Sequence, residues 1–336
     1  MTFLFAELAL MLLIILLASE VFTNALETLG ERLKISEGVT GSLFAAIGTA
    51  LPETMVPLLA LFAGTANTTV NEEIGVGAIL GAPLMLGTLS TCLMALAILR
   101  RRGVRGRICP EYTGFVRDLN FFLFAFGVAA VAMYIPTHAV VARGLVSVGL
   151  MGLYFAYLVL TLRASPQLVS AGHGTAASGI MLFSKFGLPT HLGTILLQVG
   201  CGLGLLVLGA KGFIHGVDGV ARELGISALL LSLLIIPIAT ELPEKVNSIL
   251  WIRRGKDTLA FGNITGAMVF QGTLLPAIGI ILTPWQPGIE VITVVVITLL
   301  AGAWLRFHGR LGRLPIWALF ANGALYLTFL ALTLWR

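Results

Sequence analysis

Long apolar segments, separated by short and often basic gaps, constrain this chain more than any other feature of its sequence. A segment of about 20 apolar residues crosses the hydrocarbon of a bilayer as a helix. We identify ten such segments. They are roughly 2–19, 39–63, 74–99, 119–137, 143–162, 193–214, 226–251, 258–283, 288–305 and 315–335. The sequence therefore predicts an all-α integral membrane protein with ten transmembrane helices.

Charge is too scarce in this chain for a water-exposed surface. Only 11% of the residues are charged, whereas soluble domains carry about 25%. This composition excludes a soluble enzyme, a nucleic-acid-binding protein and a disordered scaffold. Cys92, Cys109 and Cys201 have no metal-ligand spacing, and neither a metalloprotease pattern nor a phosphate-binding loop occurs. We expect no enzyme activity and no cofactor, with the lipid bilayer as a partner and the oligomeric state left open.

Basic residues in the gaps orient the predicted helices. Placing the arginine-rich gap 100–118 in the cytoplasm puts most of the 21 Lys and Arg residues on that side by alternation, as positive loops require. The first segment contains Glu7 and has no basic residue ahead of it, which argues against a cleaved signal peptide. We expect a multi-pass protein of the plasma (inner) membrane with both termini outside.

An internal repeat divides the chain. Leu-Pro-Glu at 51–53 matches Leu-Pro-Glu at 242–244, and the glycine-rich stretch 77–89 matches 262–274. Each copy contains five spans, and because five is odd the second copy enters the membrane in the opposite direction. This predicts two inverted five-helix repeats. The predicted domains are a first repeat, 1–162 with motif 48–53, a cytoplasmic linker, 163–192, and a second repeat, 193–336 with motif 239–244.

Each repeat places a carboxylate within an apolar span, Glu53 in the first and Glu244 in the second. An acid at that depth is costly and is a candidate functional group. Thr49 and Thr240 lie four residues earlier and so share the helix face of the acids. The prolines before the two acids lack an N–H and free the backbone carbonyls of Gly48 and Ala239. Hard cations bind such oxygens. The alternative is that the prolines only kink their helices and the acids pair with a base.

Further polar residues lie in the second repeat. Asn263 and Gln271 are in the eighth span, whereas the third span has few polar side chains, so we expect the second repeat to supply more of the coordination. Glu241 and Lys245 are four residues apart and can form an internal ion pair. Glu241 can equally be a third carboxylate of the site with Lys245 as its counter-charge, and the sequence leaves both interpretations open.

These motifs resemble those of the cation/calcium exchanger superfamily, and most closely its prokaryotic sodium/calcium antiporters. The resemblance covers essentially the whole chain and is most specific at 48–53, 77–89, 239–244 and 257–274. It implies that Glu53 and Glu244 bind the ion, helped by Thr49 and Thr240. The family's acid on the eighth span is replaced by Gln271 here, and a family serine is replaced by Glu241 in the second motif.

The residues and the resemblance together predict a secondary cation antiporter. We expect Ca²⁺ to be exchanged against Na⁺ or H⁺ by alternating access, at a carboxylate site near the membrane midplane. The alternative is a membrane protein that binds a cation as a sensor or structural subunit and does not transport it. Ion flux in liposomes that contain only this protein distinguishes the two.

Overall fold

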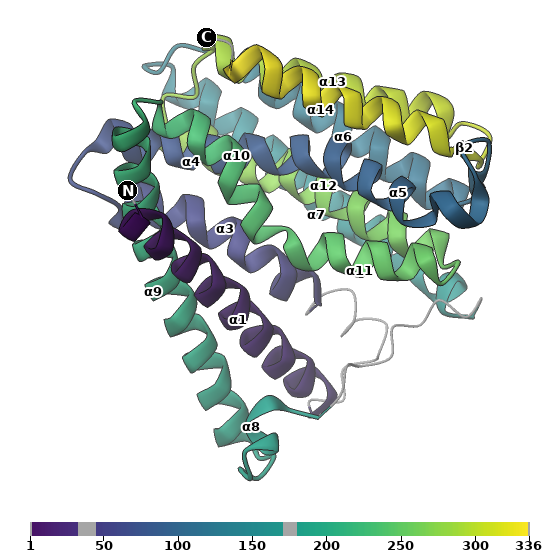
Figure 1. Ribbon diagram of the computed structural model, residues 1–336, viewed down its shortest axis with the longest axis horizontal. Coiled ribbons are helices and arrows are strands. Elements are labelled where there is room, and N and C mark those ends of the chain that lie inside the picture. The colour runs from purple at the N-terminus through teal and green to yellow at the C-terminus, as the bar shows by residue number, and fades with distance from the viewer. Residues whose placement is uncertain (1, 33–44, 171–179, 335–336) are drawn as a thin grey trace. The chain divides into compact units, whose positions relative to one another are not determined.

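The chain folds almost entirely into helices (Figure 1). This computed structural model describes residues 2–32, 45–170 and 180–334. Strands in the described part are limited to β1 (Arg107–Ile108) and β2 (Leu314–Pro315), which pair antiparallel. The prediction of an all-α protein is confirmed.

Several predicted spans coincide with a single helix and others with a composite of helices. In chain order the helices are α1 (Thr2–Arg32), α3 (Ala45–Ala63), α4 (Thr68–Met85), the π-helix η2 (Leu86–Ser90), α5 (Thr91–Arg102), α6 (Tyr112–Ala132), α7 (Val140–Ser170), α8 (Leu182–Lys185), α9 (Leu192–Leu224), α10 (Ala228–Thr240), α11 (Leu242–Arg253), α12 (Asp257–Leu282), α13 (Ile289–His308) and α14 (Ile316–Leu334). Helix α7 continues to Ser170, into the predicted linker 163–192.

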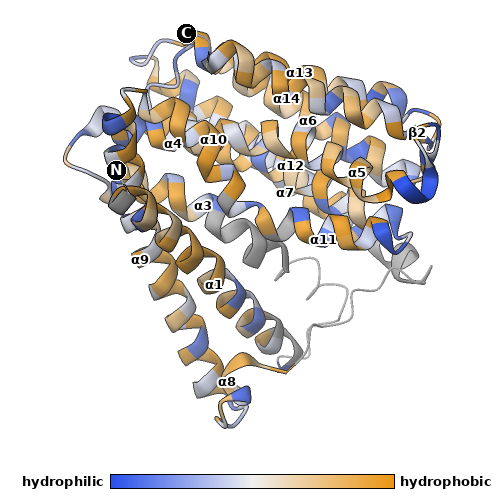
Figure 2. Cartoon of the chain, in the orientation of Figure 1, coloured by the Kyte–Doolittle hydropathy of each residue, from blue (hydrophilic) through white to orange (hydrophobic). Residues whose placement is uncertain are grey.

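The helices have the surface of a protein that lies in lipid. Within the described residues, eight helices are long and apolar enough to cross a membrane, and two further apolar helices, Glu53–Ala63 and Ala228–Ile238, are shorter. Large apolar side chains such as Phe124 and Val141 are exposed, which is unusual for a protein surrounded by water. Apolar residues cover the helices, and hydrophilic residues gather near β2 (Figure 2). This is a multi-pass membrane protein.

The chain separates into two compact units, of which the first comprises Met1–Asn71 and Leu158–Ile226. In this unit α1 packs against α9 along a row of glycines. A Cβ atom built on Gly202 would lie 2.9 Å from the backbone nitrogen of Phe22, and one on Gly209 would lie 3.3 Å from that of Ile15. Farther along, Gly216 lies against Leu8. Residue numbers rise in α9 as they fall in α1, so the two helices are antiparallel.

The second unit comprises Glu72–Tyr157 and Ser227–Arg336. Its core includes fully buried aromatic side chains, among them Phe122 and Trp285. A Cβ atom on Gly272 of α12 would lie 2.7 Å from the Phe122 ring of α6, so the absence of a side chain lets these helices approach closely. The indole N–H of Trp285 donates to the carbonyl of Ala129, at 2.9 Å. These contacts fix α12 against α6.

Gly77 and Gly81 of the third predicted span pack differently from the matching Gly262 and Gly266 of the eighth. On α4, a Cβ atom built on Gly81 would lie 2.6 Å from the carbonyl oxygen of Leu233 in α10. On α12, no atom lies within 4 Å of a Cβ atom built on Gly262. The close approach is present at the first pair, whereas in the second pair a Cβ atom on Gly266 would meet only the Tyr157 hydroxyl, at 3.5 Å. Helix α4 is thus packed onto α10.

The predicted span 226–251 is formed by two helices, α10 and α11, with an interruption between them. Helix α10 ends at Thr240, Glu241 has φ −99° and ψ 7°, and α11 begins at Leu242. Pro243 stands in the first turn of α11, where its missing N–H costs little because that N–H has no intrahelical partner. The corresponding helix of the first repeat, α3, runs without a break past Pro52.

Candidate cation site

Glu53 lies in α3, in the first unit, and its side chain is only 4% exposed. The helix around it is apolar, with Val56 and Ala60 buried on following turns. Burying a carboxylate in such an apolar helix costs a large desolvation free energy. The structure therefore agrees with the expectation that Glu53 is an interior residue rather than a solvated one.

Glu241 is the residue at which α10 and α11 meet, and it is fully buried. Its backbone N–H donates to the carbonyl of Pro237, at 3.3 Å, and its own carbonyl accepts from the N–H of Lys245, at 3.1 Å. The break in the helix thus retains two of its backbone hydrogen bonds. It also directs a carboxylate into the interior of the second unit from the junction of two helices.

The ammonium group of Lys245 occupies the space beside this carboxylate. Its Nζ lies 2.8 Å from the carbonyl oxygen of Pro237 and 2.8 Å from the Sδ atom of Met85. The Oε2 atom of Glu241 is 3.9 Å away, and the lysine is 6% exposed. A buried charge is stable only when it is paired and hydrogen-bonded. Glu241 and Lys245 therefore form the internal ion pair that the sequence allowed.

Gln271 approaches the same carboxylate from α12. Its Nε2 atom donates to Oε1 of Glu241, at 3.1 Å, and its side chain is fully buried. The glutamine and the glutamate, which stand where the resembling family has an acid and a serine, are thus in direct contact. The second unit thus has a carboxylate beside position 271, but the carboxylate belongs to Glu241, between α10 and α11, instead of to a residue of α12.

Other predicted site residues of the second unit make separate contacts. Thr240 is 2% exposed, and its hydroxyl donates to the carbonyl of Ile236, at 3.1 Å. Its oxygen keeps lone pairs with which it can accept or ligate. Asn263 donates to the Ser248 hydroxyl of α11, at 3.0 Å. Asn263 therefore joins α12 to α11.

Four predicted site residues are described as backbone only. Gly48 and Thr49 belong to α3, Ala239 to α10 and Glu244 to α11. Their side-chain placement lies outside the described residues, so their roles stay predictions. Among the residues that the structure does describe, no cluster of three or more His, Cys, Asp or Glu side chains is assembled.

Met85 is a member of this cluster that the sequence did not single out. It ends α4, and the wide turn of η2 follows it directly. π-Helical turns are rare in proteins, and those that occur are often found at functional sites. The carbonyl of Gly87 in this turn accepts from Nδ2 of Asn322, at 2.7 Å. A methionine in an apolar span is ordinarily a core residue. Only the structure shows that the Met85 sulfur contacts the Lys245 ammonium.

Asp118 and Arg143 also escaped the sequence analysis. Asp118 is 4% exposed in α6, accepts from Thr265 of α12 at 2.8 Å, and pairs with Arg117 at 3.1 Å. Arg143 is 5% exposed and donates to carbonyls at the end of α12, including that of Pro284 at 2.8 Å. An arginine at a helix C-terminus stabilises its exposed carbonyls. Arg143 lies in the first turn of α7, and Asp118 lies in the second turn of α6, directly before the predicted span 119–137.

Comparison with known proteins identifies the family. The sequence model described as "Sodium/calcium exchanger protein" matches residues 3–163 and 194–335. Among characterised sequences, CaxA of Alkalimonas amylolytica, a protein named as an antiporter, is 26% identical over 282 residues, which are 81% of this chain and 79% of the relative. The inner membrane protein YrbG of Escherichia coli K12 is 24% identical over 248 residues, 74% of this chain and 70% of the relative.

Solved structures share the fold. A crystal structure of the H⁺/Ca²⁺ exchanger CAX superposes with a TM-score of 0.75 at 19% identity, covering 98% of this chain and 82% of that one. A structure of the sodium-calcium exchanger NCX_Mj, soaked with Na⁺ and Sr²⁺, superposes with a TM-score of 0.58 at 19% identity and covers 98% of both chains. Since the family model spans most of the sequence, the chain belongs to the sodium/calcium exchanger family of the cation/calcium exchanger superfamily, whose members are membrane antiporters and not enzymes.

Proposed function

We propose that this protein is a secondary antiporter that exchanges Ca²⁺ against Na⁺ or H⁺. The observation that carries the proposal is the buried cluster of Glu241, Lys245 and Gln271 at a broken transmembrane helix of an exchanger-family chain. Buried ionisable groups inside a membrane protein mark ion pathways. Exchange uses only the cations themselves, so no cofactor is required.

In this proposal the transported cation is held near the membrane midplane by the two motifs. Glu53 and Glu244 neutralise its charge, and the hydroxyls of Thr49 and Thr240 complete the coordination. The backbone carbonyls of Gly48 and Ala239, which the prolines leave without an N–H donor, supply further oxygens. Oxygen ligands of these three kinds suit Ca²⁺ and Na⁺. The repeated sequence motif and the family support this assignment.

The second repeat contributes a third carboxylate, Glu241. The amide of Gln271 orients it, at 3.1 Å, and the tethered ammonium of Lys245 limits its net charge when no cation is bound. Asn263 helps through its bond to Ser248 by holding α12 beside α11. Clustered carboxylates favour protons or cations because like charges disfavour full ionisation, which fits a site that Ca²⁺ leaves and Na⁺ or H⁺ enters.

The architecture proposed is ten transmembrane helices in two inverted repeats, 1–162 and 193–336, joined by the linker 163–192. Helices α1 and α9 correspond in the repeat and are of nearly equal length, 31 and 33 residues. They run antiparallel within the first unit. In the second unit, Gly279 of α12 contacts Ile79 of α4 while Met268 contacts Gly87, so these corresponding segments are also antiparallel. Antiparallel pairs of equivalent helices are what inversion requires, and both observations support it.

Membrane orientation and motion follow from the same proposal. The arginine-rich gap 100–118 faces the cytoplasm, both termini are outside, and the membrane is the plasma (inner) membrane. Alternating access arises from α1 and α9, the first helices of the two repeats, which move relative to the helices that carry the motifs. The glycine row of α9 gives these two helices a smooth contact surface.

A flux screen in liposomes containing only the purified chain tests this function. Ca²⁺, Na⁺, K⁺, Mg²⁺ and H⁺ gradients are opposed in pairs, and Ca²⁺ movement is read with an indicator dye. We expect Ca²⁺ uptake that requires an outward Na⁺ or H⁺ gradient. The matched control is the Glu53→Gln protein reconstituted at the same density. Saturable Ca²⁺ binding without any gradient-driven flux would instead identify a sensor or structural subunit.

A further inference from the structure

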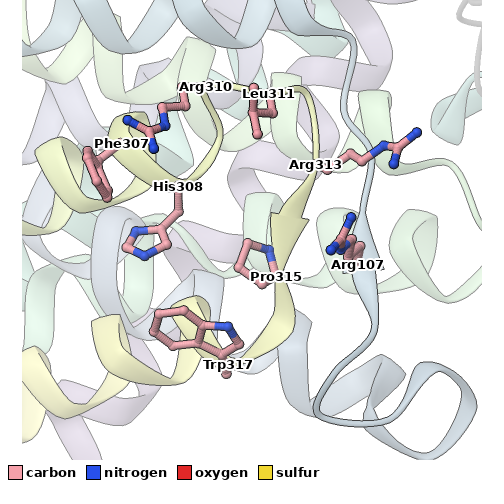
Figure 3. Close-up of a pocket in the computed structure, with 8 residues that line it drawn as sticks. All are labelled: Arg107, Phe307, His308, Arg310, Leu311, Arg313, Pro315 and Trp317. Atoms are coloured by element: carbon pink, nitrogen blue, oxygen red, sulfur yellow. The ribbon is translucent and has the colours of Figure 1, made fainter.

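A hollow of about 500 Å³ lies where α13 turns back into α14, within the second unit. Its lining combines basic and apolar side chains: Arg107, Phe307, His308, Arg310, Leu311, Arg313, Pro315 and Trp317. Figure 3 shows Arg310 and His308 on one side of Pro315 and Arg107 and Arg313 on the other. The pairing of β1 with β2 brings Arg107 opposite Pro315 and so adds a distant arginine to the hollow.

No carboxylate in the described part of the chain neutralises the positive charge of this hollow. None of its lining residues is an Asp or a Glu. Within the described part of the chain, the ion pairs involve Arg102, Arg117, Arg222 and Lys245, and none involves the three arginines of the hollow. Arg107, Arg310 and Arg313 are all exposed. Arginines gathered around one hollow attract an anion, and guanidinium geometry suits phosphate oxygens.

Aromatic side chains form one wall of the hollow, and they indicate that it lies near the membrane surface. The His308 ring lies 5.0 Å from that of Trp317, and the Arg310 guanidinium lies 4.5 Å from the centre of the Phe307 ring. The Nδ1 atom of His308 donates to the carbonyl of Trp304, at 3.1 Å. Tryptophans and arginines of this kind occupy the boundary between hydrocarbon and headgroups. Because α13 and α14 are both membrane-spanning by length and hydropathy, their turn lies at that boundary.

Exposed apolar side chains also line the hollow. Leu311 is 79% exposed, Phe307 55% and Trp317 45%. A soluble phosphate would leave these surfaces without a partner, whereas a phospholipid offers a phosphate to the arginines and acyl chains to the apolar side chains. We propose that this hollow binds the headgroup phosphate of an anionic phospholipid. Basic side chains at the membrane surface attract such lipids.

Native mass spectrometry of the full, detergent-purified chain tests the lipid site. The probes are phosphatidylglycerol, phosphatidylcholine and inorganic phosphate. We expect saturable binding of phosphatidylglycerol, much weaker binding of phosphatidylcholine, and no competition by inorganic phosphate. Each arginine removed should weaken phosphatidylglycerol binding about fivefold, so the Arg310→Gln, Arg313→Gln protein should lose most of it. The Arg310→Lys, Arg313→Lys protein should keep most of it, because it keeps the charge.

A matched control separates this site from general surface charge. Arg100 and Arg105 are equally exposed and lie outside the hollow. The Arg100→Gln, Arg105→Gln protein should bind phosphatidylglycerol as the unaltered chain does. Equal loss in both double variants, equal binding of phosphatidylcholine, or displacement by inorganic phosphate would each overturn the proposal. Thermal unfolding confirms that the variants are folded, and because binding is measured without transport, the result does not depend on the antiport function.

Discussion

The Lys245 ammonium illustrates how one buried charge depends on its partner. It contacts the Pro237 carbonyl and the Met85 sulfur, and it forms an ion pair with the Glu241 carboxylate, at 3.9 Å. Glu241→Gln should lower the free energy of unfolding by about 3–5 kcal/mol, because it removes one partner of a buried ion pair. Adding Lys245→Met should restore much of that stability. Thermal unfolding in detergent measures both effects.

Ca²⁺ flux by the same two proteins decides the role of Glu241. If Glu241 is a ligand, the double variant regains stability and still transports poorly. It should also lose the competition by H⁺ between about pH 6 and pH 8, since fewer carboxylates then share the site. Normal flux in the double variant would show that Glu241 serves only as the partner of Lys245.

The motif acids give the second prediction at this scale. Glu53→Gln and Glu244→Gln should each abolish exchange without unfolding the protein, because each removes a formal charge that must balance a cation in a medium of low dielectric constant. The measurement is Ca²⁺ flux in liposomes. Glu223→Gln is the control, since Glu223 is exposed near the end of α9. Near-normal flux in either motif variant would remove the basis of the proposed site.

Sequence spacing predicted some of the site contacts and missed others. A separation of four residues on one helix predicted the Glu241–Lys245 pair, which is present even though Glu241 lies at a helix break. The hydrogen bond from Gln271 to Glu241 joins two helices, and helical periodicity does not give the register between helices. The Met85 contact depends in addition on the glycine-mediated packing of α4 on α10, which a single sequence does not reveal.

At the scale of elements, the contact of α1 with α9 depends on missing side chains. A Cβ atom at Gly202 would lie 2.9 Å from the backbone Cα and nitrogen of Phe22, and backbone atoms cannot rotate away. Gly202→Ala should therefore destabilise the protein by about 1–3 kcal/mol, measured by thermal unfolding. Gly200→Ala is the matched control on the same helix, where no atom lies within 4 Å of the added methyl group. Equal stability of the two variants would contradict this packing.

The first turn of α6 depends on a capping carboxylate outside the membrane-spanning segment. Partial burial alone would raise the pKa of Glu111, but the backbone N–H groups of Gly114 and Thr113, at 2.6 and 2.7 Å, donate to its oxygens and the net pKa is lowered. A lowered carboxyl pKa contributes stability above the unfolded value and loses it as the pH falls through the folded value.

Glu111→Gln should consequently reduce stability at neutral pH by about 0.5–2 kcal/mol, the usual worth of such a cap. The difference from the unaltered chain should shrink as the pH falls below the ordinary carboxyl pKa of about 4.3 and through the lowered pKa of the folded state. Unfolding midpoints across that fall in pH measure it. A difference that is constant with pH would mean that the charge of Glu111 contributes nothing to the cap.

Hydropathy predicts where an apolar segment lies but does not predict a break within it. The run 226–251 is apolar throughout except near its centre, so hydropathy predicts one helix, whereas the chain breaks at Glu241. The same proline-containing motif leaves α3 continuous. The motif proline is therefore compatible with either outcome, and tertiary contacts such as those of Lys245 with Pro237 and Met85 accompany the broken form.

At the scale of the whole molecule, composition was sufficient for the membrane class, and the repeat was needed for the architecture. Each compact unit takes residues from both predicted repeats. Helices that are equivalent by sequence, α1 and α9, lie in one unit and pack on each other. The sequence identified the equivalence through matching motifs. It did not indicate that equivalent helices would become neighbours, because repeat detection says nothing about packing.

The membrane topology of the whole chain gives the last prediction. Cys109 is exposed beside β1, in the gap that we place in the cytoplasm. In a Cys92→Ser, Cys201→Ser protein, an impermeant maleimide should label Cys109 only from the cytoplasmic side. A cysteine appended after Arg336 should be labelled only from outside, because an odd number of crossings separates the two positions when α10 and α11 together make one. Labelling of both from the same side would mean that the broken helix does not cross the membrane as a single span. Labelling of Cys109 from outside would reverse the orientation of the entire chain.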